Sequence, residues 1–123
     1  MSYEFYKALH FLGLMLVFLG IGGLFAPAMG PPAEGPARPS GARRLALVSH
    51  GVGMLFMLVA GFGMLAKLKL GFPAWVHPKL LIWLLLGLVV LIPRRAPALA
   101  RPVWLVLPVL GVIAGALAIY KPF

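Results

Sequence analysis

Four long apolar runs constrain this chain more than any other feature of its sequence. They cover Phe5 to Phe25, Leu45 to Leu65, about Trp75 to Ile92, and Val103 to Tyr120. At a rise of 1.5 Å per residue, each run is about long enough to cross a hydrocarbon core of ~30 Å. Apolar residues make up 63% of the 123, more than a soluble domain of this length could bury. We therefore predict an all-α, integral-membrane four-helix bundle.

The runs leave little chain between them, so we expect a single transmembrane domain. It comprises residues 1–123, with helices at about 4–26, 44–67, 75–93 and 102–120. The longest connection, residues 27–43, is rich in proline and glycine and too polar to span a membrane. This composition predicts a flexible loop.

The net charge of +9 comes from 11 basic and two acidic residues. The basic residues are scattered over loop ends, a pattern that excludes nucleic acid as a partner and favours anchoring at lipid headgroups. Four spans put both termini on one side of the membrane. If Lys7 and Lys79 serve a site, the remaining loop cations are Lys67, Lys69 and Lys121 on that side, against Arg38, Arg43, Arg44, Arg94, Arg95 and Arg101 on the other. We therefore expect both termini outside and the arginine-bearing loops in the cytoplasm.

Several kinds of chemistry have no candidate residues in this sequence. No Asp or Glu lies at the membrane centre of a predicted helix, so proton coupling through buried carboxylates is not expected. The chain also lacks cysteine, a Ser/His/Asp set, a phosphate-binding loop and a His-Glu-x-x-His motif. No catalytic residue can be assigned, and the chemistry that remains is redox chemistry carried by a cofactor.

The three histidines are the main candidate site residues, because an ionisable group in a membrane is costly unless it binds something. His10 lies about two turns into the first helix, with Lys7 one turn away on the same face. His77 opens the third helix at a similar depth and is followed by Pro78 and Lys79. A neutral imidazole can bind iron, and a lysine nearer the interface can neutralise haem propionates. This pattern is compatible with a haem site across the first and third helices, with His10 and His77 as metal ligands and the two lysines as cofactor-binding residues.

His50 lies about two turns in from the opposite membrane face, on the order of 10 Å in depth from His10. One haem ring cannot readily join both histidines. His50 is therefore a candidate metal ligand at a second site near Gly20, Gly22 and Gly23, or else it forms a hydrogen bond to a carbonyl or to Ser49. Polar packing and placement at the membrane interface remain alternatives for each of the three histidines.

Glycines share helix faces with these histidines. Gly13 and Gly20 lie on the His10 face of the first helix, and Gly53 follows His50 in the second. Close contact between helices explains such glycines without a ligand. In the alternative interpretation a flat cofactor fills the groove, and Gly13 is then a cofactor-binding residue.

Three short motifs resemble small bacterial membrane proteins of the SirB, HemJ and CopD-like groups. They are Tyr6-Lys-Ala-Leu-His-Phe-Leu-Gly13 with Gly20-Ile-Gly-Gly23, Ser49-His-Gly51, and Trp75-Val-His-Pro-Lys-Leu-Leu81. The resemblance implies a four-helix bundle in a bacterial inner (cytoplasmic) membrane and, for the HemJ branch, a b-type haem with a role in oxidising protoporphyrinogen. The sequence departs from that branch in lacking a tryptophan after the first-helix histidine and in placing proline between His77 and Lys79.

Two functions follow from these observations. The first is a small integral-membrane b-type haem protein with an electron-transfer or redox role, and with a quinone or another redox partner. The second is a non-catalytic accessory or assembly subunit, whose glycine grooves receive a partner helix or a lipid. Either protein is compatible with a homodimer or a larger membrane complex.

Overall fold

The structure is a computed structural model that describes residues 2–31 and 41–120. Within these residues four helical spans are long and apolar enough to cross a membrane. They are α1 (Tyr3–Met29), α2 (Gly41–Leu68), a third span formed by α3 (Val76–Leu88), a 3₁₀ turn (Val89–Leu91) and α4 (Ile92–Arg95), and a fourth formed by a second 3₁₀ turn (Pro97–Leu99) and α5 (Ala100–Tyr120). The predicted all-α, four-helix membrane fold is confirmed. Residues 32–40 of the loop predicted at 27–43 lie outside the described residues.

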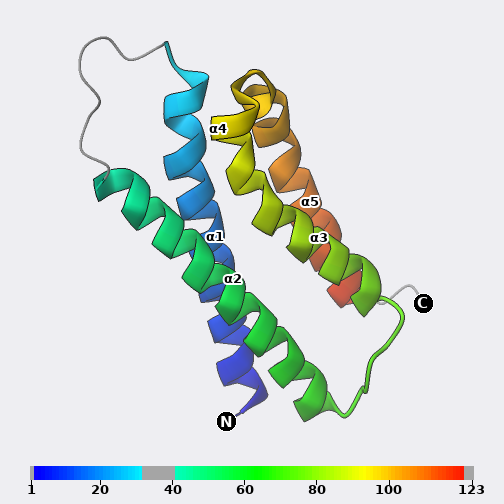
Figure 1. Cartoon of the computed structure of the whole chain (residues 1–123). Helices are drawn as coiled ribbons and strands as arrows, with labels where there is room; N and C mark the ends of the chain where they lie inside the picture. Colours follow the sequence, from blue (N-terminus) through cyan, green and yellow to red (C-terminus); the bar gives the residue numbers. More distant parts are fainter. Residues whose placement is uncertain (1, 32–40, 121–123) are drawn as a thin grey trace.

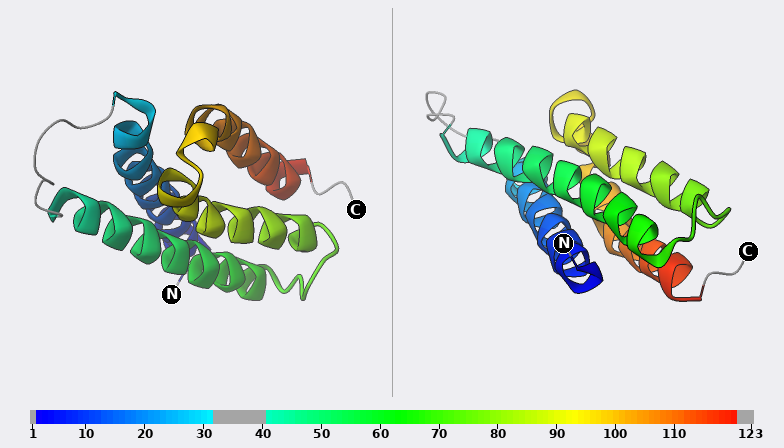
Figure 2. Two further views of the ribbon diagram at one scale, coloured as in Figure 1. Left: turned by 45° about the horizontal axis from the view of Figure 1, so that its top comes forward. Right: turned by 90° about the horizontal axis from the view of Figure 1, so that it is seen from below.

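The spans form two pairs (Figures 1 and 2): α2 crosses α1 on one side of the bundle, and α3 runs beside α5 on the other. The start of α1, the α2–α3 connection and the last turn of α5 share one end of the bundle, which we call the terminal end. The start of α2 and the α4 region lie at the opposite end (Figure 1), which we call the arginine end because Arg43, Arg44, Arg94, Arg95 and Arg101 belong to these segments.

Capping and proline chemistry explain where the helices begin and change form. The backbone N–H of Phe5 donates to Ser2 Oγ at 3.1 Å and caps the start of α1. Pro27 lies in the last turn of α1 and cannot donate to the Gly23 carbonyl, yet the helix continues to Met29 rather than ending at about residue 26. Pro93 has no N–H for the Val89 carbonyl, which instead accepts from the N–H of Ile92. The third span is therefore interrupted by a 3₁₀ turn where the sequence predicted one continuous helix.

Glycines bring the backbones of α1 and α2 into direct contact. A Cβ atom on Gly53 would lie 2.6 Å from the carbonyl oxygen of Gly13 and 2.7 Å from the nitrogen of Val17. A Cβ atom on Gly20 would lie 2.5 Å from the carbonyl oxygen of Ala46. No side chain fits at these positions without separating the helices, so the glycines set the distance between α1 and α2.

Two clusters of buried side chains hold the pairs together. The larger joins all four spans toward the arginine end and consists of Val17, Ile21, Leu24, Phe25, Ala46, Met54, Ile82, Leu86, Ala100 and Leu107. The smaller lies at the terminal end, where Leu65, Trp75 and Val76 pack with Leu80 and Ala118. The space between the two clusters is where the candidate site lies.

Candidate functional site

A cavity of about 540 Å³ lies in the terminal half of the bundle, with walls from all four spans. Most of its lining is apolar, and its charged or titratable side chains are Tyr3, Lys7, His10 and Lys79. Residues 3, 7, 10 and 14 are spaced by three or four, which puts them on one face of α1. Because of this helical periodicity, Tyr3, Lys7 and His10 of α1 line the same cavity.

His10 is held in one orientation by the neighbouring helix. Its Nδ1–H donates to the carbonyl oxygen of Met57 at 3.0 Å, and a carbonyl can only accept. The lone pair of the neutral ring is then on Nε2, the nitrogen left for a ligand. Within the described chain, Nε2 has no hydrogen-bond partner. Every fully buried side-chain nitrogen in that part of the chain has a partner, so Nε2 is not fully buried. This arrangement is typical of metal-ligating histidines, whose other ring nitrogen donates to a carbonyl.

The cavity has cations but no anion among its described wall residues. Lys7 is exposed, whereas Lys79 is half-buried and lines the same cavity as His10. Glu4, the acidic residue that the structure describes, is exposed in the first turn of α1 and does not line the cavity. The walls therefore match a ligand with an apolar body and a negatively charged group.

His77 lies outside this cavity. It is exposed, and its Nδ1–H donates to the carbonyl oxygen of Ala74 at 3.2 Å, within its own turn. Its ring also meets Phe72 edge-on, with 4.8 Å between the ring centroids. The structure thus brings Lys7, His10 and Lys79 to one cavity and places His77 at the surface beside it.

His50 lies in the larger core and is only 6% exposed. Its Nε2–H donates to the carbonyl oxygen of Leu86 at 2.8 Å. Leu86 is in the last turn of α3, where carbonyls lack regular helical partners. Ser49 instead donates from Oγ to the carbonyl of Leu16 at 2.9 Å. Of the alternatives that the sequence left open, the structure shows the carbonyl bond, which links α2 to α3.

Replacing His50 by leucine is expected to lower the free energy of unfolding by about 1–2 kcal/mol, since an interhelical hydrogen bond is lost. His50→Gln, which keeps an N–H donor, should lose less, and His77→Leu at the exposed surface should change stability by less than ~0.5 kcal/mol. Denaturant titration in detergent micelles measures all three variants. Equal losses for the leucine and glutamine variants would contradict a role for the bond to Leu86.

Gly13, predicted as a cofactor-binding residue, lies at the α1–α2 crossing and is not among the residues lining the cavity. Two features of the cavity wall were missed by the sequence reasoning. Trp83 lines it and donates from Nε1 to the Met54 carbonyl at 3.0 Å. Its position four residues after Lys79 was the available signal. The second feature is the set of small α5 residues Gly111, Ala114, Gly115 and Ala118, whose helical spacing also predicts a common face.

The described residues contain no group of three or more His, Cys, Asp or Glu side chains that could hold a metal ion. A metal in the cavity would therefore depend on a cofactor for most of its ligands. Comparisons with protein-family models, curated proteins and solved structures give no match. The fold and the cavity together define a small multi-pass membrane protein with a cation-lined internal site.

Proposed function

We propose that this protein binds a b-type haem in the cavity and has an electron-transfer or redox role. The observation that supports the proposal is the bond from His10 Nδ1–H to the Met57 carbonyl, which leaves the lone pair of Nε2 for a ligand. In this proposal Nε2 of His10 would bind the iron, and Lys7 and Lys79 would pair with the propionates. His77 is not included, because it does not line the cavity.

The residues present fit such a group in size and chemistry. Cofactor pockets commonly measure ~300–1,000 Å³ and combine apolar walls with a few polar groups. The cavity of about 540 Å³ lies within this range. Its lysines come from α1 and α3, near the start of each helix at the terminal end, while His10 is one turn deeper along α1. This order suits carboxylates near the membrane surface and a ring below them.

The side chains divide the work between them. His10 would hold the iron, and its bond to Met57 restrains rotation of the ring. Lys7 and Lys79 would offset the charge of the two carboxylates in surroundings of low dielectric constant. The apolar walls from α2, α3 and α5 exclude water. A bound haem would supply one-electron chemistry, at a potential set by its ligand and by this burial.

The proposal is tested by purifying the full chain in mild detergent, adding haemin, and recording reduced-minus-oxidised spectra. We expect a Soret band and an α band at a stoichiometry of one haem per chain. Variants Lys7→Met and Lys79→Met should each weaken haemin binding by about tenfold, because each removes one charge-assisted contact. The absence of both bands after reconstitution would overturn the proposal.

A second candidate function is that of an accessory or assembly subunit of a larger membrane complex. It is favoured by His50 and by the α1–α2 glycines, which have structural partners that require no cofactor. This function predicts that His10→Leu leaves complex assembly intact, which pull-down from native membranes would show. For either function we propose a bacterial inner membrane with the arginine end in the cytoplasm, because five described arginines lie at that end.

A further inference from the structure

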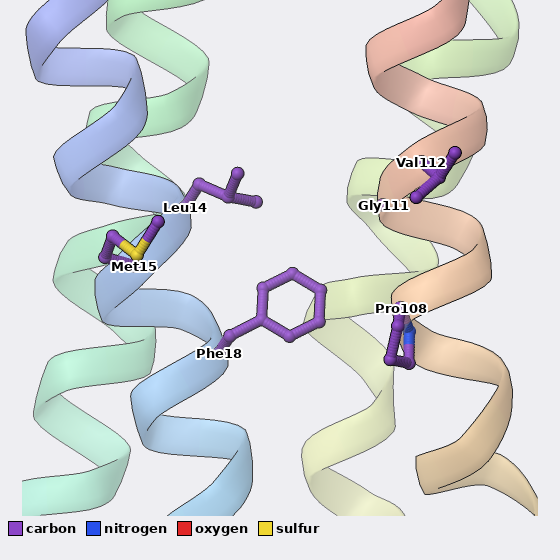
Figure 3. A pocket seen from close by; sticks show the side chains of 6 residues that line it. All are labelled: Leu14, Met15, Phe18, Pro108, Gly111 and Val112. Carbon is purple, nitrogen blue, oxygen red and sulfur yellow. The ribbon is translucent and has the colours of Figure 1, made fainter.

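A second hollow opens on the lipid-facing surface between α1 and α5. It measures about 320 Å³ and is lined by Leu14, Met15 and Phe18 of α1 and by Pro108, Gly111 and Val112 of α5 (Figure 3). Met15 is 63% exposed and Val112 72% exposed, so the hollow faces the outside of the bundle. Since both helices are membrane spans, the medium at this surface is hydrocarbon.

The hollow adjoins the cation-lined cavity. Leu14 and Gly111 line both spaces, so the α1–α5 seam is their common wall. Figure 3 shows the ring of Phe18 reaching from α1 toward α5. A Cβ atom on Gly111 would lie 3.5 Å from Cζ of Phe18, an ordinary contact. The Phe18 ring is therefore the side chain that bridges the seam.

Two clusters of buried side chains bound the cavity, although Lys7, Phe62 and Leu68 of its wall are exposed at the terminal end. Toward the arginine end lies the larger core, and at the terminal end Leu65, Trp75 and Val76 form the smaller buried cluster with Leu80 and Ala118. By contrast, the α5 side presents small residues, and a Cβ atom on Gly115 would meet nothing within 4 Å. A path through the seam would displace fewer packed side chains than a path through either cluster.

We propose that the cavity takes up an anionic amphiphile dissolved in the bilayer, which enters sideways between α1 and α5 as Phe18 moves aside. We infer a negative charge on the ligand from Lys7 and Lys79 in the cavity wall. We infer its solubility in the bilayer from the position of the seam on the lipid-facing surface. Only the identification of this amphiphile as haem rests on the proposed function. Other membrane-soluble carboxylates with an apolar body share the same chemistry.

Because the chain has no cysteine, the seam can be closed selectively. In the double variant Phe18→Cys/Gly111→Cys, a short bismaleimide joins α1 to α5. We expect haemin to load from liposomes at least about tenfold more slowly into the cross-linked protein than into the same double variant before cross-linking, and to leave it more slowly by a similar factor. Phe18→Ala alone should speed loading. Each single-cysteine variant treated with the same reagent is the matched control.

Two probes separate this inference from the haem proposal. If haemin binds and the cross-link leaves its loading rate unchanged, lateral access is overturned while haem binding stands. If haemin binds to no variant, the haem proposal fails, and the fluorescent fatty acid cis-parinaric acid becomes the probe. Slower parinarate uptake after cross-linking then supports the seam, whereas unchanged uptake or no parinarate binding overturns it.

Discussion

Replacing Gly53 by valine is expected to destabilise the α1–α2 pair by about 3 kcal/mol or more, or to prevent the bundle from forming. Even the first added carbon would lie 2.6 Å from the Gly13 carbonyl oxygen and 2.7 Å from the Val17 nitrogen. Both atoms belong to the backbone, so a side-chain rotation cannot relieve the overlap and the helices must separate. Gly53→Ala should show a smaller loss of the same sign, measured by denaturant titration of the purified protein in micelles.

Gly51 in the same helix is the matched control. A Cβ atom there meets nothing within 4 Å, so Gly51→Ala removes flexibility without a clash. Glycine costs a helix about 0.5–1 kcal/mol relative to alanine, and we expect Gly51→Ala to be neutral or slightly stabilising. If Gly51→Ala and Gly53→Ala changed stability equally, helix propensity rather than close packing would explain the glycines.

Replacing His10 by glycine is expected to remove haem absorbance at stoichiometric haemin, and added imidazole is expected to restore it. Losing the partner of a metal ligand already costs ~10–100-fold in affinity, so losing the ligand should cost more than about 100-fold. The variant leaves a space at the cavity wall beside Gly61, where free imidazole can take the position of the side chain. Spectral titration with haemin, with and without imidazole, measures both effects.

His77→Gly and His50→Gly serve as controls for this experiment. His77 lies outside the cavity and His50 bonds to Leu86, so neither variant should need imidazole for its haem spectrum. His10→Gly also loses the bond to Met57, and its free energy of unfolding is expected to fall by about 1 kcal/mol. Unchanged haemin affinity in a folded His10→Gly protein would contradict ligation by His10.

The fold could be predicted because apolar runs long enough to span a membrane are recognisable in the sequence itself. The four apolar runs predicted the four spans that the structure contains. The interruption at Val89 could not be predicted as easily, since a proline can end, kink or begin a helix. In this chain the interruption arises because Pro93 has no N–H to donate to the Val89 carbonyl, which accepts from the N–H of Ile92 instead.

The candidate site was harder to predict than the fold. Depth along a helix follows from residue counting, and it correctly grouped Lys7 and Lys79 with His10 at one end of the bundle. The rotation of α3 does not follow from counting, and that rotation leaves His77 outside the cavity. The sequence also gives no indication of which carbonyl a histidine will meet, because Met57 and Leu86 act through their backbones.

The glycine contact between α1 and α2 makes this helix pair the rigid half of the bundle. The distance between α1 and α2 is set by backbone atoms, so we expect it to stay the same when side chains on the cavity face change in size. The other pair, α3 with α5, is joined to α2 by side-chain packing and by two hydrogen bonds, from His50 of α2 to the Leu86 carbonyl and from Trp83 of α3 to the Met54 carbonyl. A cavity for a wider or narrower ligand would therefore be obtained through substitutions in α3 and α5.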